Sequence, residues 1–138
     1  MGDEKLDSLR DKLDALRIEP HSNKELAELL NSMAHLEFRN TPQIASKHAM
    51  EALNLAMESG SKGVIAESYH LCSLTEWILG DLAKAMDYCR KSLQLWMKLE
   101  DNRGLGRAFN NLGNIHKELG NYSKALQFHL KSLIENIT

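Results

Sequence analysis

The sequence predicts an all-α fold: an α-solenoid of three antiparallel helix pairs preceded by one further helix, seven helices in all. Two observations lead to this prediction. Residues that end helices recur at intervals of 40, as Asn40, Gly80 and Gly120, and internal repeats with periods of roughly 20 to 50 residues are typical of solenoids. Between these breaks the apolar residues are spaced by three and four, the period of an amphipathic helix, and no segment alternates as a strand would.

The whole chain, residues 1–138, is expected to form one domain. The interval of 40 also relates small residues and leucines at equivalent positions: Ala45, Ala85 and Ala125, and Leu53, Leu93 and Leu133. This repeat divides the chain into an N-terminal helix (1–20), a divergent first repeat (23–60), a second repeat (63–100) and a third repeat (103–138).

The first expected helix runs from about Asp3 to Ile18 and ends before Pro20, because proline cannot continue a helix. It carries a seam of four leucines with spacings of 3, 4 and 3: Leu6, Leu9, Leu13 and Leu16. We expect this seam to pack on the first repeat as a capping helix. A contact between two chains is the alternative, because a heptad-like seam also suits coiled coils.

Local signals mark where the other helices begin and end. Ser22 followed by Glu25 resembles a capping box. The run Asn40-Thr41-Pro42 combines a break, a cap and a proline at the first helical position. Gly80-Asp81 separates the helices of the second repeat and Gly120-Asn121 those of the third, since glycine suits the left-handed conformation that ends a helix.

The composition excludes several classes of function. The formal net charge of −2 leaves no basic excess for nucleic-acid binding, and no run approaches the ~20 apolar residues that would span a membrane. With two cysteines and no apolar signal peptide, we expect a cytoplasmic protein. No metal-ligand spacing, catalytic triad, carboxylate pair or phosphate loop can be assembled. The chain alone is therefore expected to be no enzyme and to need no cofactor, while an attached catalytic domain is left open.

Two pairs of reactive side chains have a structural interpretation. Cys72 and Cys89 lie on the two helices of one repeat and are expected to act as small buried hydrophobes rather than as a redox switch. His116 and His129 stand where aromatic core residues are expected, so we expect them to be buried or half-buried rather than to bind a metal.

The third repeat carries the most specific motif. The run Leu112-Gly113-Asn114-Ile115-His116 is followed by Gly120-Asn121-Tyr122-Ser123-Lys124-Ala125. These residues resemble the tetratricopeptide repeat and its pattern W-x2-L-G-x2-Y…A-x3-F…P, with His116 replacing the tyrosine and His129 the phenylalanine. The resemblance covers about residues 23–138, and the period of 40 rather than the usual ~34 resembles the longer-helix variety. It implies helix hairpins wound into a right-handed superhelix, with Gly113 and Ala125 allowing close approach.

The resemblance also implies a site. The first helix of each pair would line a concave groove that binds a peptide or helix of a partner protein. Carried over to this sequence, the groove residues are Asn31, His70, Leu74, Trp77, Arg107, Asn110, Asn111, Asn114 and Lys117. Arg107 and Asn111, four apart, could read a carboxylate or a carbonyl together. Trp77 is either a groove anchor or, as we expect, part of the core between helices.

One sub-family of tetratricopeptide repeats does not fit this sequence. The repeats that grip the C-terminal carboxylate of chaperones use a set of lysine, arginine and asparagine side chains. The matching positions here are Leu30, Ala34, Leu71, Arg107 and Asn111. Only Arg107 remains as a cation, so a chaperone-tail clamp is not expected.

The resemblance leaves two functions open. The first is a non-catalytic protein–protein interaction module, and the alternative is a regulatory or oligomerising segment of a larger bacterial signalling enzyme (a nucleotide cyclase, kinase or phosphatase). The residues after Leu133 leave an apolar end without a covering helix, so we expect a fragment of a longer chain or self-association. Candidate oligomer contacts are Leu6, Leu9, Leu13, Leu16, Leu133 and Ile137.

Overall fold

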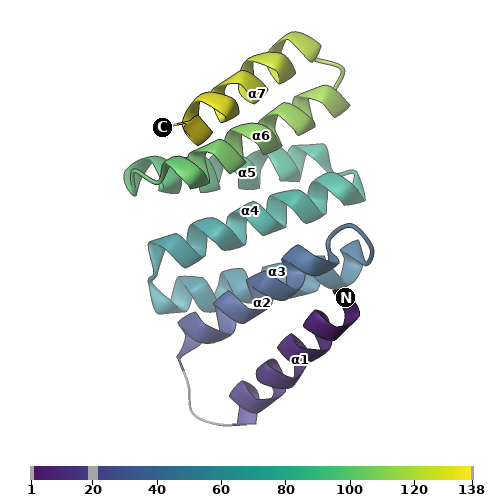
Figure 1. Cartoon of the computed structure of the whole chain (residues 1–138), viewed down its shortest axis with the longest axis vertical. Coiled ribbons are helices and arrows are strands. Elements are labelled where there is room, and N and C mark those ends of the chain that lie inside the picture. Colours follow the sequence, from purple (N-terminus) through teal and green to yellow (C-terminus); the bar gives the residue numbers. More distant parts are fainter. Residues whose placement is uncertain (1, 19–21, 138) are drawn as a thin grey trace.

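A computed structural model describes residues 2–18 and 22–137. In this part the chain forms seven α-helices and no strand, which confirms the predicted all-α solenoid (Figure 1). The helices are α1 (Gly2–Ile18), α2 (Asn23–Glu37), α3 (Pro42–Ser59), α4 (Lys62–Leu79), α5 (Leu82–Lys98), α6 (Asn102–Glu118) and α7 (Tyr122–Ile137).

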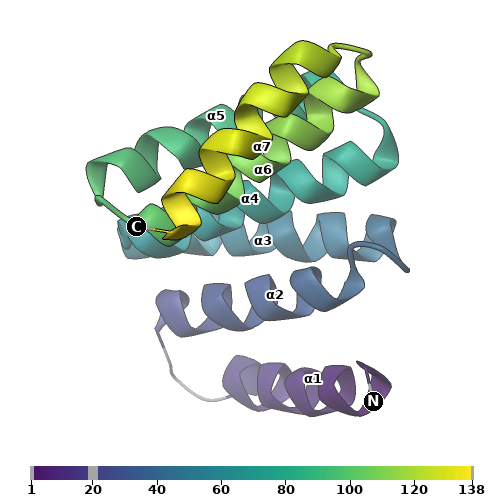
Figure 2. The same cartoon turned by 45° about the horizontal axis from the view of Figure 1, so that its top comes forward.

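The helices form three pairs that stack in the order of the chain. α2 pairs with α3, α4 with α5 and α6 with α7, and each pair joins the next through α3 with α4 and α5 with α6. The first helices also touch one another, α2 with α4 and α4 with α6, so they form a layer of their own. α1 lies at one end of the stack and α7 at the other (Figures 1 and 2).

The sequence signals that begin helices act as caps at α2, α5 and α6. At α3 the predicted cap is wrong, because Thr41 makes no cap hydrogen bond and its hydroxyl donates to the Glu37 carbonyl at 3.3 Å. The Ser22 hydroxyl accepts a hydrogen bond from the Glu25 backbone N–H at 3.2 Å, as the capping box predicts. Asp81 and Asp101 cap α5 and α6 in the same way, accepting from backbone N–H groups at 3.1 and 2.9 Å. Each cap satisfies an N–H that the first turn of a helix otherwise leaves unpaired.

The turns after α3, α4, α5 and α6 depend on left-handed residues, whereas the turn after α2 has none. Gly60, Gly80 and Gly120 have φ values of 73°, 92° and 79°. The turn between α5 and α6 has no glycine, and Glu100 takes a φ of 54° there instead. Glu100 occupies the position equivalent to Gly60, 40 residues later, so this one repeat holds a side chain in a conformation that costs an L-residue energy.

Close packing within the third pair depends on Gly113. A Cβ built on Gly113 would lie 2.6 Å from Cε1 of the His129 ring. The predicted role of Gly113 in close helix packing is therefore confirmed. His129 and His116 are both half-buried, and the His116 ring stacks on Phe128 with 5.3 Å between ring centroids.

The two cysteines are buried free thiols. Cys72 belongs to an apolar cluster with Phe38 and Leu71, and Cys89 to a second cluster with Leu112 and Ile115. Burial raises the pKa of each thiol to about 12. The prediction that both act as small buried hydrophobes is confirmed by their 0–1% exposure.

α1 caps the first repeat. Its Leu13 is only 4% exposed and packs with Leu29, Leu30 and Met33, while Leu9 and Leu16 lie partly buried against the same cluster. Arg17 adds an ion pair with Glu51 of α3 at 2.8 Å. The capping role expected for the seam is the one the structure shows. The alternative contact between chains is wrong for Leu13, because its side chain is already covered within the chain.

Candidate functional site

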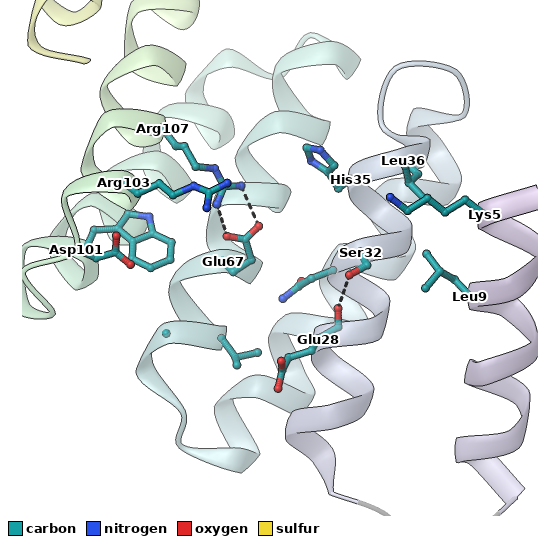
Figure 3. Close-up of a pocket in the computed structure, with 14 residues that line it drawn as sticks. Lys5, Leu9, Glu28, Ser32, His35, Leu36, Glu67, Asp101, Arg103 and Arg107 are labelled. Carbon is teal, nitrogen blue, oxygen red and sulfur yellow. Dashed lines mark hydrogen bonds and ion pairs between the residues drawn. The ribbon is translucent and has the colours of Figure 1, made fainter. Parts of the chain in front are cut away.

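The first helices of the pairs border a cavity of about 730 Å³. α2, α4 and α6 supply most of its lining, and α1 closes one side (Figure 3). Trp96 of α5 also lines the cavity. We call this space the groove cavity. Its lining residues are Lys5, Leu9, Glu28, Asn31, Ser32, His35, Leu36, Gly63, Val64, Glu67, Trp96, Asp101, Arg103 and Arg107.

An ion pair joins α4 to α6 at the wall of the groove cavity. The Arg107 guanidinium donates to both carboxylate oxygens of Glu67, at 2.6 and 2.9 Å (Figure 3). Burial raises the pKa of Glu67, but the hydrogen bond and the charge of Arg107 outweigh burial, and the pKa is lowered. The cation that the sequence assigns to ligand recognition is therefore already engaged with a carboxylate of the same chain.

Asn31 is a buried lining residue of this cavity, and half of its amide is unused. The side chain is 4% exposed, and its Oδ1 accepts from the Ser68 hydroxyl of α4 at 3.1 Å. Its Nδ2 has no hydrogen-bond partner among the described residues. An amide can donate and accept, so the donor half of Asn31 is a buried polar group without a partner among the described residues.

Asn111 has a structural role instead. It is 1% exposed, and its Nδ2 donates to the Ser73 hydroxyl at 2.7 Å. Ser73 in turn donates to the Ala85 carbonyl at 2.6 Å, which links α6, α4 and α5. The expectation that Arg107 and Asn111 face a ligand together is not what the structure shows, because Asn111 points into the core.

His70 is also buried, at 5% exposure, and its Nδ1 has no partner among the described residues. Burial first, and the charge of Arg107 second, lower the pKa of His70 to about 4. The imidazole is therefore neutral at neutral pH. In a neutral imidazole one ring nitrogen donates and the other accepts.

The remaining residues predicted for the groove divide into two groups. Leu74 and Trp77 are partly buried against the apolar clusters, and Trp77 contacts two of them, so it joins the cores of neighbouring pairs. Asn110 and Lys117 are exposed on α6, and Asn114 is half-buried. The Asn110 amide lies 3.0 Å from Nδ1 of His129.

A second cavity, of about 460 Å³, lies between α6 and α7. Its lining includes Asn110, His129 and Asn136, and it shares Arg107 with the groove cavity. The two cavities thus meet at the residue that is paired with Glu67. Asparagine amides gathered in this way can bind a peptide backbone, which offers both carbonyl and N–H groups.

Several residues of the site were not predicted from the sequence. Lys5 and Leu9 of α1 and Arg103 of α6 line the groove cavity as well. One signal that could have revealed α1 is Leu13, which stands 40 residues before Leu53, as Leu53 stands 40 before Leu93. α1 therefore occupies the place of the second helix of a preceding repeat, and its side chains reach the edge of the cavity.

The described residues also bear on metal binding and on membrane insertion. They contain no group of three histidine, cysteine or acidic side chains placed to hold a metal ion. No helix among them has the length and apolar character needed to cross a membrane.

Comparison with known proteins identifies the family. A family model described as the tetratricopeptide repeat matches residues 64–133, which extend from α4 into α7. A search of curated proteins finds no match to the chain. The matched segment contains the glycine–histidine packing of the third pair, the buried asparagine–serine link and the Glu67–Arg107 ion pair. The chain belongs to the tetratricopeptide repeat family.

Proposed function

We propose that this chain is a non-catalytic module that binds an extended segment or a helix of a partner protein in the groove cavity. Tetratricopeptide repeat proteins are in general protein-interaction modules. The observation that carries the proposal is the cavity of about 730 Å³ that the first helices of the pairs border. Helices and extended segments of partner proteins are commonly recognised in grooves.

The charges around the cavity favour a ligand with polar or charged side chains. Lys5 and Arg103 bring positive charge to its rim, and Glu28 brings negative charge from α2. All three side chains are exposed, so they can reorient toward a ligand at little cost. Leu9 and Leu36 add an apolar wall between α1 and α2 (Figure 3).

The test blocks the cavity without disturbing the core. Peptides are selected by phage display on the wild-type protein, synthesised with fluorescein, and titrated by fluorescence anisotropy. Ser32→Trp places a large ring on the cavity wall from an exposed position of α2. Ala83→Trp, on the exposed side of α5, is the matched control.

We expect Ser32→Trp to weaken binding at least tenfold and Ala83→Trp to leave it unchanged. Hydrogen exchange of the complex should show protection in α2, α4 and α6. Equal affinity for both variants, or protection confined to α3 and α5, would show that the groove cavity is not the binding site.

A further inference from the structure

α7 carries an apolar face that no described residue covers. Leu126, Leu130, Leu133 and Ile134 are 62%, 50%, 58% and 60% exposed. The opposite side of the helix packs on α6, through Ala125, Phe128 and Ser132 among others. In Figure 1, α7 lies at the end of the stack, beyond α6.

Part of this face has an equivalent in the earlier repeats. Leu133 corresponds to Leu53 in α3, which is 7% exposed, and to Leu93 in α5, which packs on the cluster of α5 and α6 residues. Leu126 corresponds to Met86, which packs on the same cluster. In these positions the next helix pair supplies the cover.

Leu130 and Ile134 are different. Leu130 corresponds to Met50 and Arg90, and Ile134 corresponds to Asn54 and Gln94. All four of these equivalents are exposed, although α4 and α6 are in place beside them.

Met50 is nevertheless in contact with the next pair, since its Sδ lies 3.8 Å from Cys72 Sγ of α4 and 3.5 Å from the Tyr88 hydroxyl of α5. A further pair stacked like α4 and α5 would therefore cover Leu130 only in part and would leave Ile134 in water. The apolar character of Ile134 is not explained by the stacking of repeats.

The spacing of the exposed residues indicates what covers them. Leu126, Leu130 and Leu133 are separated by four and three residues, and Ile137 continues the series after another four. This is the spacing of a seam along which two helices pair side by side. The side chain of Ile137 lies outside those the structure describes, so the geometric argument rests on the other residues.

Charge decides between possible partners. A surface that pairs with an identical copy must avoid like charges opposite each other. Gln127 and Asn136, which flank the seam, are uncharged. The Lys131 side chain lies over the Phe128 ring rather than along the seam, with its Nζ 5.4 Å from the ring centroid.

The other end of the stack cannot take this role. α1 exposes Asp7, Arg10, Asp11 and Asp14, so contact between α1 of one copy and α7 of another would remove charges from water. We propose that a second copy of this chain covers the apolar face, with α7 packed against α7 about a two-fold axis. Such a contact is closed and yields a dimer rather than a filament.

The test uses substitutions that the chain already carries elsewhere. In Leu130→Arg/Ile134→Gln, α7 takes the residues that α5 has at the equivalent positions, Arg90 and Gln94. Because α5 folds with them exposed, we expect the variant to fold, as checked by its circular dichroism and thermal midpoint. Gln94→Arg, which adds a positive charge to the exposed side of α5, is the control.

Sedimentation equilibrium over a concentration series measures the association. We expect the wild type and Gln94→Arg to reach twice the chain mass of 15.6 kDa, and Leu130→Arg/Ile134→Gln to dissociate at least tenfold more readily. A wild type that stays monomeric throughout the series overturns the proposal. So does a dimer that the double substitution leaves unchanged, because its contact then lies elsewhere.

A photocrosslink locates the contact independently of any destabilising change. p-Benzoylphenylalanine at Gln127, an exposed flank of the seam, should join two chains through residues of α7. The same group at Gln94 of α5 should not. Crosslinks from Gln127 that map to another helix overturn the two-fold arrangement.

Discussion

Arg107 of α6 holds Glu67 of α4 through two hydrogen bonds of 2.6 and 2.9 Å, and the two residues are 40 positions apart. They stand at equivalent positions of consecutive repeats, so a repeat position carries opposite charges in neighbouring pairs. The side chains are 34% and 27% exposed, which makes this pair neither a surface salt bridge nor a fully buried one. It fixes the spacing of two helices that line the groove cavity.

The ion pair should make stability depend on acid. The folded-state pKa of Glu67 lies below its ordinary value of 4.5. The contribution of the Glu67 ion pair to the free energy of unfolding is therefore complete above pH 4.5. It is lost as the pH falls below 4.5, since the unfolded chain then binds the additional proton. We expect Glu67→Gln to lower the free energy of unfolding at pH 7 by about 1 kcal/mol, allowing for the exposure of the pair.

Urea denaturation of both proteins at pH 7 and near pH 3 measures this difference. The difference in the free energy of unfolding between the wild type and Glu67→Gln should be smaller near pH 3 than at pH 7. Glu118→Gln, which changes an exposed carboxylate at the end of α6, should show no gap at pH 7. A gap that is the same at both pH values would contradict the assignment of the acid dependence to Glu67.

His70 should give a second dependence on pH, at higher values. Its pKa is lowered from 6.5 to about 4 in the folded chain, mainly by burial. The unfolded chain takes up the proton first as the pH falls, so stability is full above pH 6.5 and decreases between 6.5 and 4. At ~1.4 kcal/mol per pKa unit, the loss across this window is on the order of 3 kcal/mol.

The titration of the His70 ring by NMR measures its pKa directly. Urea denaturation at pH 7 and pH 5 should show a smaller loss of stability for His70→Leu than for the wild type. If the His70 ring titrates near 6.5, the imidazole is hydrated in the folded chain and the expected dependence disappears.

Glu100 should be a position where a single substitution stabilises the fold. Its φ of 54° suits glycine, which the equivalent turn has at Gly60 with a φ of 73°. Releasing a side chain from the left-handed region is worth about 1 kcal/mol. We expect Glu100→Gly to raise the thermal midpoint by several degrees. Glu100→Ala, which keeps a Cβ in the same conformation, is the control and should bring no comparable gain.

Local signals made the fold predictable, while the site depended on packing that spacing alone does not determine. Caps such as Ser22 and turns such as Gly80 act over four or five residues, so these helix ends could be predicted from neighbours in the sequence. Asn31 and Asn111 could be placed on the first helices of pairs. Their burial depends on hydroxyls of α4, from Ser68 and Ser73, that lie more than 35 residues away in the sequence.

Packing also explains why the sequence did not predict Lys5 at the rim of the cavity, whereas it did predict the apolar face of α7 at the end of the stack. Lys5 reaches the groove cavity only because α1 packs on α2 in the manner of a second helix of a repeat. The apolar face of α7, in contrast, could be predicted, because Leu133 keeps the leucine that the earlier repeats have at Leu53 and Leu93. The equivalents of Ile134, which are Asn54 in α3 and Gln94 in α5, add what the sequence pattern alone did not show, that stacking leaves this position in water.

Gly113 offers the sharpest test of the close packing within a helix pair. A Cβ at this position would lie 2.6 to 2.8 Å from three atoms of the His129 ring. The ring is half-buried between α6 and α7, so it cannot move away freely. Overpacking of this kind costs about 1–3 kcal/mol, and we expect Gly113→Ala to lower the free energy of unfolding by that amount despite the better helix propensity of alanine.

The chain supplies a matched control for this substitution. Gly63, in the first turn of α4, has no atom within 4 Å of a Cβ built on it. Gly63→Ala should therefore be neutral or should stabilise the protein by up to about 1 kcal/mol. Combining Gly113→Ala with His129→Ala removes the ring that the new methyl group meets, so Gly113→Ala should cost less in that background than in the wild type. Equal costs in the two backgrounds would mean that His129 does not set the requirement for glycine.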